Sequence, residues 1–200
     1  MKKIGVIFGG MSTEHEVSIS SGTSIISNLD KQKYEILPIY ISKSGEWYKY
    51  TKPVNDIIPL HVGDEITELE KIENEFECLK SLDIAFPVLH GLYGEDGTIQ
   101  GLLELLKIKY VGCKVLSSSI CMDKVYAKIV FDKAQIPQAD YAYVKAEKGK
   151  YTYVHKNFDE ETLDLDQICK KIESKLGLPV FVKPSNSGSS VGIKKAENIE

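Results

Sequence analysis

The apolar positions in the first half of the chain follow two patterns. Compact runs rich in β-branched residues occupy residues 4–8, 36–41 and 84–89, and such runs are typical of strands buried on both faces. Apolar residues at helical spacing follow the first run and, from Ile99 to Leu106, the third run. This alternation of strands and helices predicts an α/β domain with an open, mainly parallel sheet.

The first predicted helix begins with residue types that favour helix N-termini. Ser12 and Thr13 are good N-cap residues, and Glu14 and Glu16 follow where negative charge complements the helix dipole. We therefore expect Ser12 or Thr13 to cap this helix, which should end near residues 28–30.

The pattern is weaker between the second and third runs. A turn signal precedes residues 46–50, which we predict to pair with the second strand as a hairpin. Seven acidic residues stand between positions 64 and 77, so we interpret residues 52–80 as a solvated helix or loop. A short strand is predicted at residues 110–113.

The second half of the chain has a different order of elements. We place the boundary after residue 115, which gives domains 1–115 and 116–200. The elements predicted for the second domain are a helix ending before Pro137, strands at residues 141–145 and 151–155, a helix closed by Gly177, a strand at residues 180–183, a Gly/Ser loop at residues 185–192 and a strand beginning at Ile193. These elements are few for an independent core, so we expect a truncated protein.

Composition narrows the class of protein. The 200 residues are 42% hydrophobic and 27% charged with a formal net charge of −4, which is typical of a soluble globular protein and argues against a general nucleic-acid binder. No apolar run approaches the roughly 20 residues of a membrane span. The four cysteines form no CxxC pair and stand far from the histidines in sequence, so we expect no zinc or redox motif and reduced, cytoplasmic thiols.

The turn after the first strand is the first of three segments with candidate chemistry. Gly9 and Gly10 allow a ligand to approach the backbone, and Glu14 and Glu16 stand beside a helix start. The two acids favour binding of an amine, and complementing the helix dipole explains them equally well. The residues alone leave both interpretations open.

The second segment, residues 90–98, follows the third predicted strand at the edge where open α/β sheets bind ligands. His90 can donate a hydrogen bond to a carboxylate, with Glu95 or Asp96 fixing its ring. The alternative is a polar turn in which Asp96 caps the next helix. A histidine beside two acids favours the functional interpretation.

The third segment combines a lysine with a loop rich in N–H and hydroxyl donors. Lys183 ends a strand and residues 185–192 follow it, an arrangement that can fold over phosphates. The loop lacks the Gly-Lys-Ser/Thr ending of a Walker A motif, and a flexible linker is the alternative. The lysine and the strand that resumes at once favour the phosphate loop, whereas Lys124 alone indicates only a solvated helix residue.

Together these segments resemble the D-alanine–D-alanine ligases of the ATP-grasp superfamily. The resemblance is carried by residues 8–18, 90–101, 122–124 and 182–192, which stand in the order seen in that family. Ligases that join D-alanine to D-lactate or D-serine look similar over the same stretch. A non-catalytic binding fragment is a third hypothesis, from a different functional class.

The resemblance implies roles for particular residues. Glu14 would bind the ammonium of the first D-alanine, His90 would lie near the carboxylate of that substrate, and Glu95 would be a further substrate contact. Ser189 would help to close the site and link to Glu14, which makes Glu14, His90 and Ser189 the implied catalytic set. The residues implied to bind ATP are Lys124, Lys183, Gly188, Ser189 and Ser190.

The resemblance also implies a reaction used in peptidoglycan precursor synthesis. ATP phosphorylates the carboxylate of one D-alanine, and the amine of a second D-alanine attacks the acyl phosphate. The family's Mg²⁺ ligands lie in a C-terminal lobe beyond this sequence. We therefore expect the second domain to be part of an α+β central ATP-grasp lobe, no metal site in this chain, and no activity from the 200-residue chain alone. A cytoplasmic homodimer without nucleic-acid or membrane partners is the implied assembly.

Overall fold

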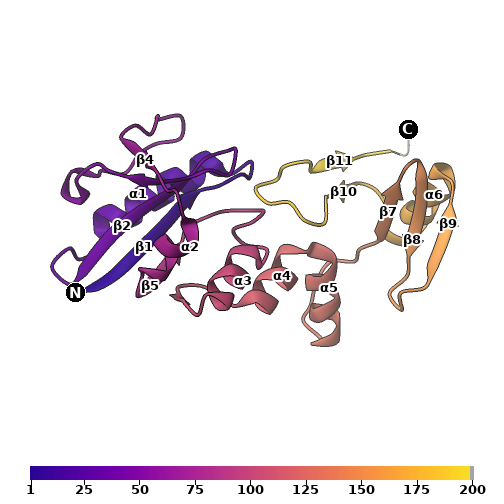
Figure 1. Ribbon diagram of the computed structural model, residues 1–200. Coiled ribbons are helices and arrows are strands. Elements are labelled where there is room, and N and C mark those ends of the chain that lie inside the picture. The colour runs from indigo at the N-terminus through magenta and orange to yellow at the C-terminus, as the bar shows by residue number, and fades with distance from the viewer. Residues whose placement is uncertain (199–200) are drawn as a thin grey trace. The chain divides into compact units, whose positions relative to one another are not determined.

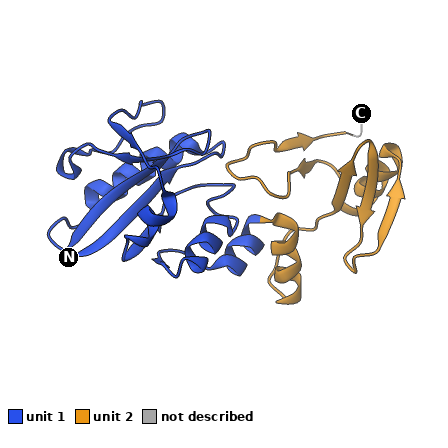
Figure 2. Cartoon of the chain, viewed as in Figure 1, with its two compact units in different colours: residues 1–122 blue, residues 123–200 orange. Residues whose placement is uncertain are grey.

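The computed structural model describes residues 1–198 (Figure 1). The chain forms two compact units, Met1–Met122 and Asp123–Glu200 (Figure 2). The compact units divide after Met122, at the end of α4 (Val115–Met122). The domain boundary that the sequence suggests, after residue 115, lies at the start of this helix and stays a prediction. Within the described residues, no helix is both long enough and apolar enough to cross a membrane.

The first unit is built on a six-stranded sheet with the strand order β4-β3-β2-β1-β5-β6. Its strands are β1 (Lys2–Gly9), β2 (Tyr34–Ile41), β3 (Trp47–Tyr50), β4 (Leu69–Lys71), β5 (Ile84–Pro87) and β6 (Lys109–Tyr110). β1 pairs in parallel with β2 and β5, and β5 pairs in parallel with β6. β3 and β4 extend the sheet antiparallel to their neighbours, so the predicted mainly parallel α/β sheet and hairpin are confirmed.

Helices cover both faces of this sheet. α1 (His15–Asn28) packs on one face, and α2 (Glu75–Lys80) and α3 (Thr98–Leu105) pack on the other. A short 3₁₀ helix η1 lies at Val54–Asp56, and α4 follows β6. Val6 of β1 lies in one core cluster with Ile26 of α1, whereas Ile7 lies in the other with Leu79 of α2 and Leu103 of α3. All five side chains are fully buried, and burying a side chain of this size contributes about 1.5–3 kcal/mol. The continuous apolar run of β1 therefore reflects burial on both faces.

The connections leave β1 and β5 in opposite directions across the sheet. The chain passes from β1 through α1 to β2 on one side, and from β5 through α3 to β6 on the other. The carboxyl ends of two adjacent parallel strands thus form a topological switch point, the position at which open α/β sheets bind ligands.

Within the described residues, the second unit holds two small antiparallel sheets and two helices. Its elements are α5 (Lys124–Lys133), β7 (Tyr143–Glu147), β8 (Lys150–Val154), β9 (Glu160–Leu163), α6 (Leu165–Leu176), β10 (Val180–Val182) and β11 (Lys194–Ala196). β7, β8 and β9 form a three-stranded meander, and β10 pairs with β11. Asp164 and Gln167 form a capping box at the start of α6, and Ile168 of this helix and Tyr153 of β8 are both buried.

Several predictions of local structure were wrong. Neither Ser12 nor Thr13 caps α1, because Glu14 occupies the N-cap position and the Ser12 hydroxyl donates to another loop. Residues 52–80 contain β4 and α2, and the strand predicted at residues 84–89 ends at Pro87. α4 and β9 were not predicted.

Candidate functional site

The candidate site of the first unit begins at the glycine pair that ends β1. Gly9 has φ +90° and Gly10 has φ +93°, a region that side chains other than glycine rarely adopt. A Cβ on Gly9 would lie 2.2 Å from the carbonyl oxygen of Ile41, so the turn also lacks room for a side chain. The Gly10 N–H donates to the same carbonyl at 2.8 Å, which holds the turn against the end of β2.

Glu14 leads from this turn into α1 and lies beside the loop that follows β5. Gly91 has φ +68°, and a Cβ on it would lie 2.6 Å from Oε2 of Glu14. The Ser12 hydroxyl donates to the carbonyl oxygen of His90 at 2.6 Å. The first two sequence-predicted segments are therefore neighbours at the β1/β5 switch point.

His90 is held by a residue that sequence reasoning missed. Its Nε2 atom lies 3.2 Å from the hydroxyl of Ser21 on α1. The expectation that Glu95 or Asp96 fixes the ring was wrong, because both carboxylates accept from backbone groups instead. Oε2 of Glu95 accepts from the Gly91 N–H at 2.8 Å, so Glu95 shapes the loop that borders Glu14.

Asp96 organises the rest of the loop after β5. Its carboxylate accepts from the N–H of Tyr93 at 2.8 Å and from the N–H of Thr98 at 2.9 Å. Partial burial opposes ionisation of this carboxyl, but the two N–H groups outweigh that effect and hold the pKa of Asp96 below its usual value. Asp96 thus stabilises the start of α3, as expected for a polar turn before a helix. It does so from the residue before the N-cap, which is Gly97.

The second unit brings Lys124 and the Gly/Ser loop together. The backbone N–H of Lys124 donates to the Ser185 carbonyl at 3.0 Å, and its Nζ donates to the Ser187 carbonyl. Asp123 caps α5 by accepting from the N–H groups of Val125 and Tyr126, which fixes the first turn on which Lys124 stands. Lys124 is therefore a loop contact, which its sequence position alone did not indicate.

The Gly/Ser loop is a series of tight turns. Ser189 and Ser190 have φ angles of 45° and 61°, consecutive left-handed conformations that are unusual for residues other than glycine. The Val191 N–H donates to the Gly188 carbonyl at 3.0 Å. Lys183 is exposed directly after β10, at the entrance to this loop. Two lysines and backbone N–H donors are groups that stabilise the negative charge of phosphates.

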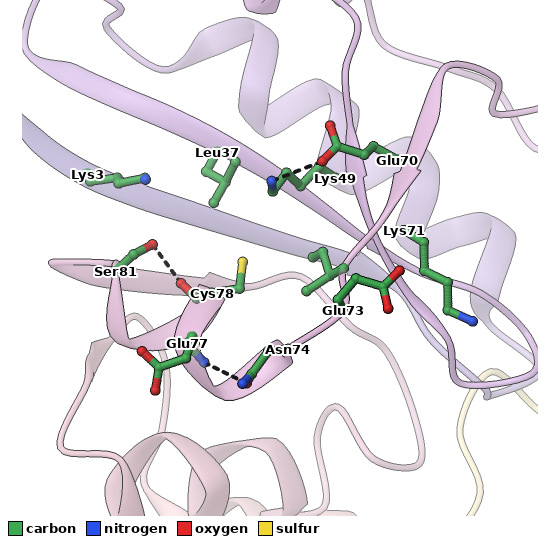
Figure 3. A pocket seen from close by; sticks show the side chains of 11 residues that line it. Lys3, Leu37, Lys49, Glu70, Lys71, Glu73, Asn74, Glu77, Cys78 and Ser81 are labelled. Atoms are coloured by element: carbon green, nitrogen blue, oxygen red, sulfur yellow. Dashed lines mark hydrogen bonds and ion pairs between the residues drawn. The ribbon is translucent and has the colours of Figure 1, made fainter.

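A pocket on the first unit lies apart from these motifs. Its volume is about 490 Å³, and it is lined by residues that include Lys3, Lys49 and Cys78 (Figure 3). None of its lining residues belongs to the segments with candidate chemistry. Lys49 is paired with Glu70 at 3.3 Å, and burial raises the pKa of the Cys78 thiol. The carboxyl ends of β1 and β5, rather than this pocket, carry the candidate site.

Within residues 1–198, no three His, Cys, Asp or Glu side chains are grouped so that they could hold a metal ion.

Comparisons with known families match both parts of the chain. The family described as "D-ala D-ala ligase N-terminus" matches residues 3–113, and the family described as "D-ala D-ala ligase C-terminus" matches residues 130–200. The D-alanine–D-alanine ligase of Clostridium acetobutylicum is 50% identical over 98% of this chain and 54% of that protein. That of Clostridium novyi is 48% identical over 100% of this chain and 54% of that protein.

Solved structures agree with these matches. The VanG D-Ala:D-Ser ligase from Enterococcus faecalis is 36% identical with a TM-score of 0.73, over 98% of this chain and 56% of that chain. A D-alanine–D-alanine ligase from Bacillus anthracis, complexed with ATP, is 35% identical with a TM-score of 0.64, over 99% of this chain and 51% of that chain. The chain spans about half the length of the curated relatives it matches. With both family matches in chain order and a parallel-rich sheet whose carboxyl edge carries Glu14 and His90, the chain belongs to the D-alanine–D-alanine ligase family.

Proposed function

We propose that the full-length protein, meaning this chain with any sequence that its gene encodes beyond it, joins two D-alanine molecules at the expense of ATP. The observation that carries this proposal is the carboxylate of Glu14 beside the loop of His90 at the β1/β5 switch point. An anionic group and a hydrogen-bond donor at one edge of the sheet match the ammonium and the carboxylate of an amino acid.

In the first step, Glu14 binds the ammonium of one D-alanine and His90 donates to its carboxylate. A carboxylate oxygen forms a bond to the γ-phosphorus of ATP, the bond from that phosphorus to the β–γ bridging oxygen breaks, and ADP leaves. Lys124, Lys183 and the N–H groups around Gly188 and Ser190 hold the phosphates as negative charge moves onto ADP.

In the second step, the neutral amine of a second D-alanine attacks the acyl carbon. The bond from that carbon to the phosphate oxygen breaks, inorganic phosphate leaves, and the nitrogen loses a proton. We assign to Ser189 the role of helping to close the site, as the family resemblance implies, and to Glu95 that of supporting the loop beside Glu14. We extend the proposal to Mg²⁺ as the metal that accompanies ATP, and to a homodimer in the cytoplasm, as the family resemblance implies.

The test is a product analysis with competing acceptors. The full-length protein is incubated with ATP, Mg²⁺ and equal concentrations of D-alanine, D-serine and D-lactate, and the products are separated by chromatography. We expect D-alanyl-D-alanine as the main product and no ADP release without D-alanine. A main product that contains D-lactate or D-serine would refute the proposed acceptor.

The similarity to the VanG D-Ala:D-Ser ligase makes D-serine the second candidate acceptor. A non-catalytic binding fragment is the remaining alternative. For the 200-residue chain alone we expect no D-alanine-dependent phosphate release, with the full-length protein as the control. Turnover by the chain within tenfold of that control would contradict this expectation.

A further inference from the structure

Two buried polar side chains in the first turn of α1 hold the candidate site together. Ser18 is fully buried, and His15 is 4% exposed. Polar groups this deep in a core cost stability unless they are hydrogen-bonded, so their partners indicate why they stand there.

Ser18 joins the carboxyl ends of β1 and β5. Its hydroxyl accepts from the Gly9 N–H at 2.9 Å and donates to the Val88 carbonyl at 2.6 Å. The backbone N–H of Ser18 donates to the Glu14 carbonyl at 3.0 Å, so the same residue also fixes the N-cap. One serine therefore connects Glu14, the glycine turn and the strand that leads to His90.

His15 joins the glycine turn to β2. Its Nδ1 lies 2.5 Å from the Gly10 carbonyl, and because a carbonyl only accepts, this bond requires a proton on Nδ1. Nε2 lies 3.2 Å from the Tyr40 hydroxyl, and in the neutral ring it accepts from that hydroxyl. Together Ser18 and His15 tie the first turn of α1 to the ends of three adjacent strands.

We propose that Ser18 and His15 are positioning residues for the first substrate: they contact no reacting atom and set the place of Glu14 relative to His90. This inference rests on the proposed function. Glu14 directly precedes His15 and reaches toward Gly91, so its carboxylate is placed by the turn that these two side chains fix.

The chain offers a matched control for Ser18. Thr23 is also a fully buried hydroxyl residue of α1, and it likewise accepts from a backbone N–H, that of Leu60, at 2.9 Å. Its hydroxyl donates to the Ile19 carbonyl at 2.8 Å, and none of these hydrogen bonds involves the glycine turn. Ser18→Ala and Thr23→Ala remove comparable hydrogen bonds, but only the first touches the site.

The experiment measures the KM for D-alanine, the KM for ATP and the melting temperature of these variants in the full-length protein. We expect Ser18→Ala to raise the KM for D-alanine about tenfold, the effect of roughly 1.4 kcal/mol, with the KM for ATP within twofold of wild type. Thr23→Ala should lower the melting temperature and leave both KM values within twofold. Equal D-alanine KM values in the two variants would overturn the inference.

A second pair of variants decides the question if Ser18→Ala does not fold. The amide nitrogen of His15→Asn can stand where Nδ1 does and keep the bond to Gly10, whereas the longer His15→Gln cannot place its amide there. We expect His15→Asn to keep the D-alanine KM within threefold and His15→Gln to raise it about tenfold. The reverse order, or no difference between the two, would refute the inference.

A wild-type protein that forms no dipeptide would refute the proposed function and not the positioning role. Crystal structures of Ser18→Ala and Thr23→Ala then decide the latter. The Glu14 carboxylate must move away from Gly91 in the first variant and stay in place in the second. An unmoved Glu14 in Ser18→Ala overturns the inference.

Discussion

Replacing Gly91 with alanine would act on Glu14 without changing any charge. The added Cβ would lie 2.6 Å from Oε2 of Glu14, and ordinary contact begins at 3.4 Å, so the carboxylate has to retreat by about 0.8 Å. A charge-assisted hydrogen bond of about 2.8 Å to a substrate ammonium would lengthen to roughly 3.6 Å, at which it is lost.

The magnitude follows from that loss. A hydrogen bond to a charged group contributes about 1.5–3 kcal/mol, so under the proposed function the KM of the full-length protein for D-alanine should rise roughly ten- to hundredfold. Because the end of the Glu14 side chain can swing aside, the cost in stability comes mainly from the alanine at φ +68°, about 1–2 kcal/mol. We therefore expect a large change in KM and a modest fall in melting temperature.

Gly63→Ala is the matched control, because Gly63 has φ +97° and no atom within 4 Å of a built Cβ. It carries similar backbone strain without touching the site. The assay is phosphate release by variants of the full-length protein at saturating ATP over a range of D-alanine concentrations, with a melting curve for each variant. If Gly91→Ala and Gly63→Ala give D-alanine KM values within twofold of each other, the placement of Glu14 beside Gly91 has no role in binding. In a Glu14→Gln background, Gly91→Ala should have a smaller effect, since the charge is already gone.

Three other predictions concern single groups. Under the proposed function, Glu14→Gln in the full-length protein should raise the KM for D-alanine roughly ten- to hundredfold in steady-state assays and leave the KM for ATP within twofold, because only the partner of the substrate ammonium is lost. A thiol-specific reagent followed by mass spectrometry should label the exposed Cys113 and Cys121 before the half-buried Cys78, whose pKa is raised by burial; first labelling of Cys78 would contradict this order. The lowered pKa of Asp96 means that its ionised form stabilises the fold above its usual pKa of about 3.9, and that this contribution disappears as the pH falls through the lowered value. In urea unfolding measured from pH 7 to pH 3, the free energy of unfolding should fall less steeply at acid pH in Asp96→Asn than in wild type. The same slope in both proteins would contradict this prediction.

The elements that sequence reasoning located correctly are those with a strong local signal. β1 and β2 are buried on both faces or against a helix, so their apolar runs stand out. β4 is a three-residue edge strand with two charged residues, and α2 is a six-residue helix capped by Asn74, so neither leaves a hydrophobic period. β4 depends on pairing with β3, and α2 on packing of Leu79 in the core, and a local pattern contains neither contact.

The sequence was enough to propose the binding residues of the candidate site, but not the residues that position them. Glu14 and His90 could be proposed from their motifs because acids and a histidine after strands are informative residue types. Ser18, Ser21 and His15 could not, because a serine or histidine on a helix has the same sequence signature whether its partner is another residue or the solvent. The partners of His90 and Glu95 are set by a meeting of two loops far apart in sequence, and only the fold brings those loops together.

The two adjacent left-handed serines of the Gly/Ser loop have a consequence for protein engineering. A residue with a Cβ costs roughly 1–2 kcal/mol in this conformation, so Ser189 and Ser190 place strain of a few kcal/mol in one short stretch of backbone. Glycine at either position would relax that strain and would also delete a hydroxyl and loosen the loop. A selection for heat resistance alone should therefore enrich glycine at these positions, whereas a selection for turnover should restore serine, so the two selections would pull the same residues in opposite directions.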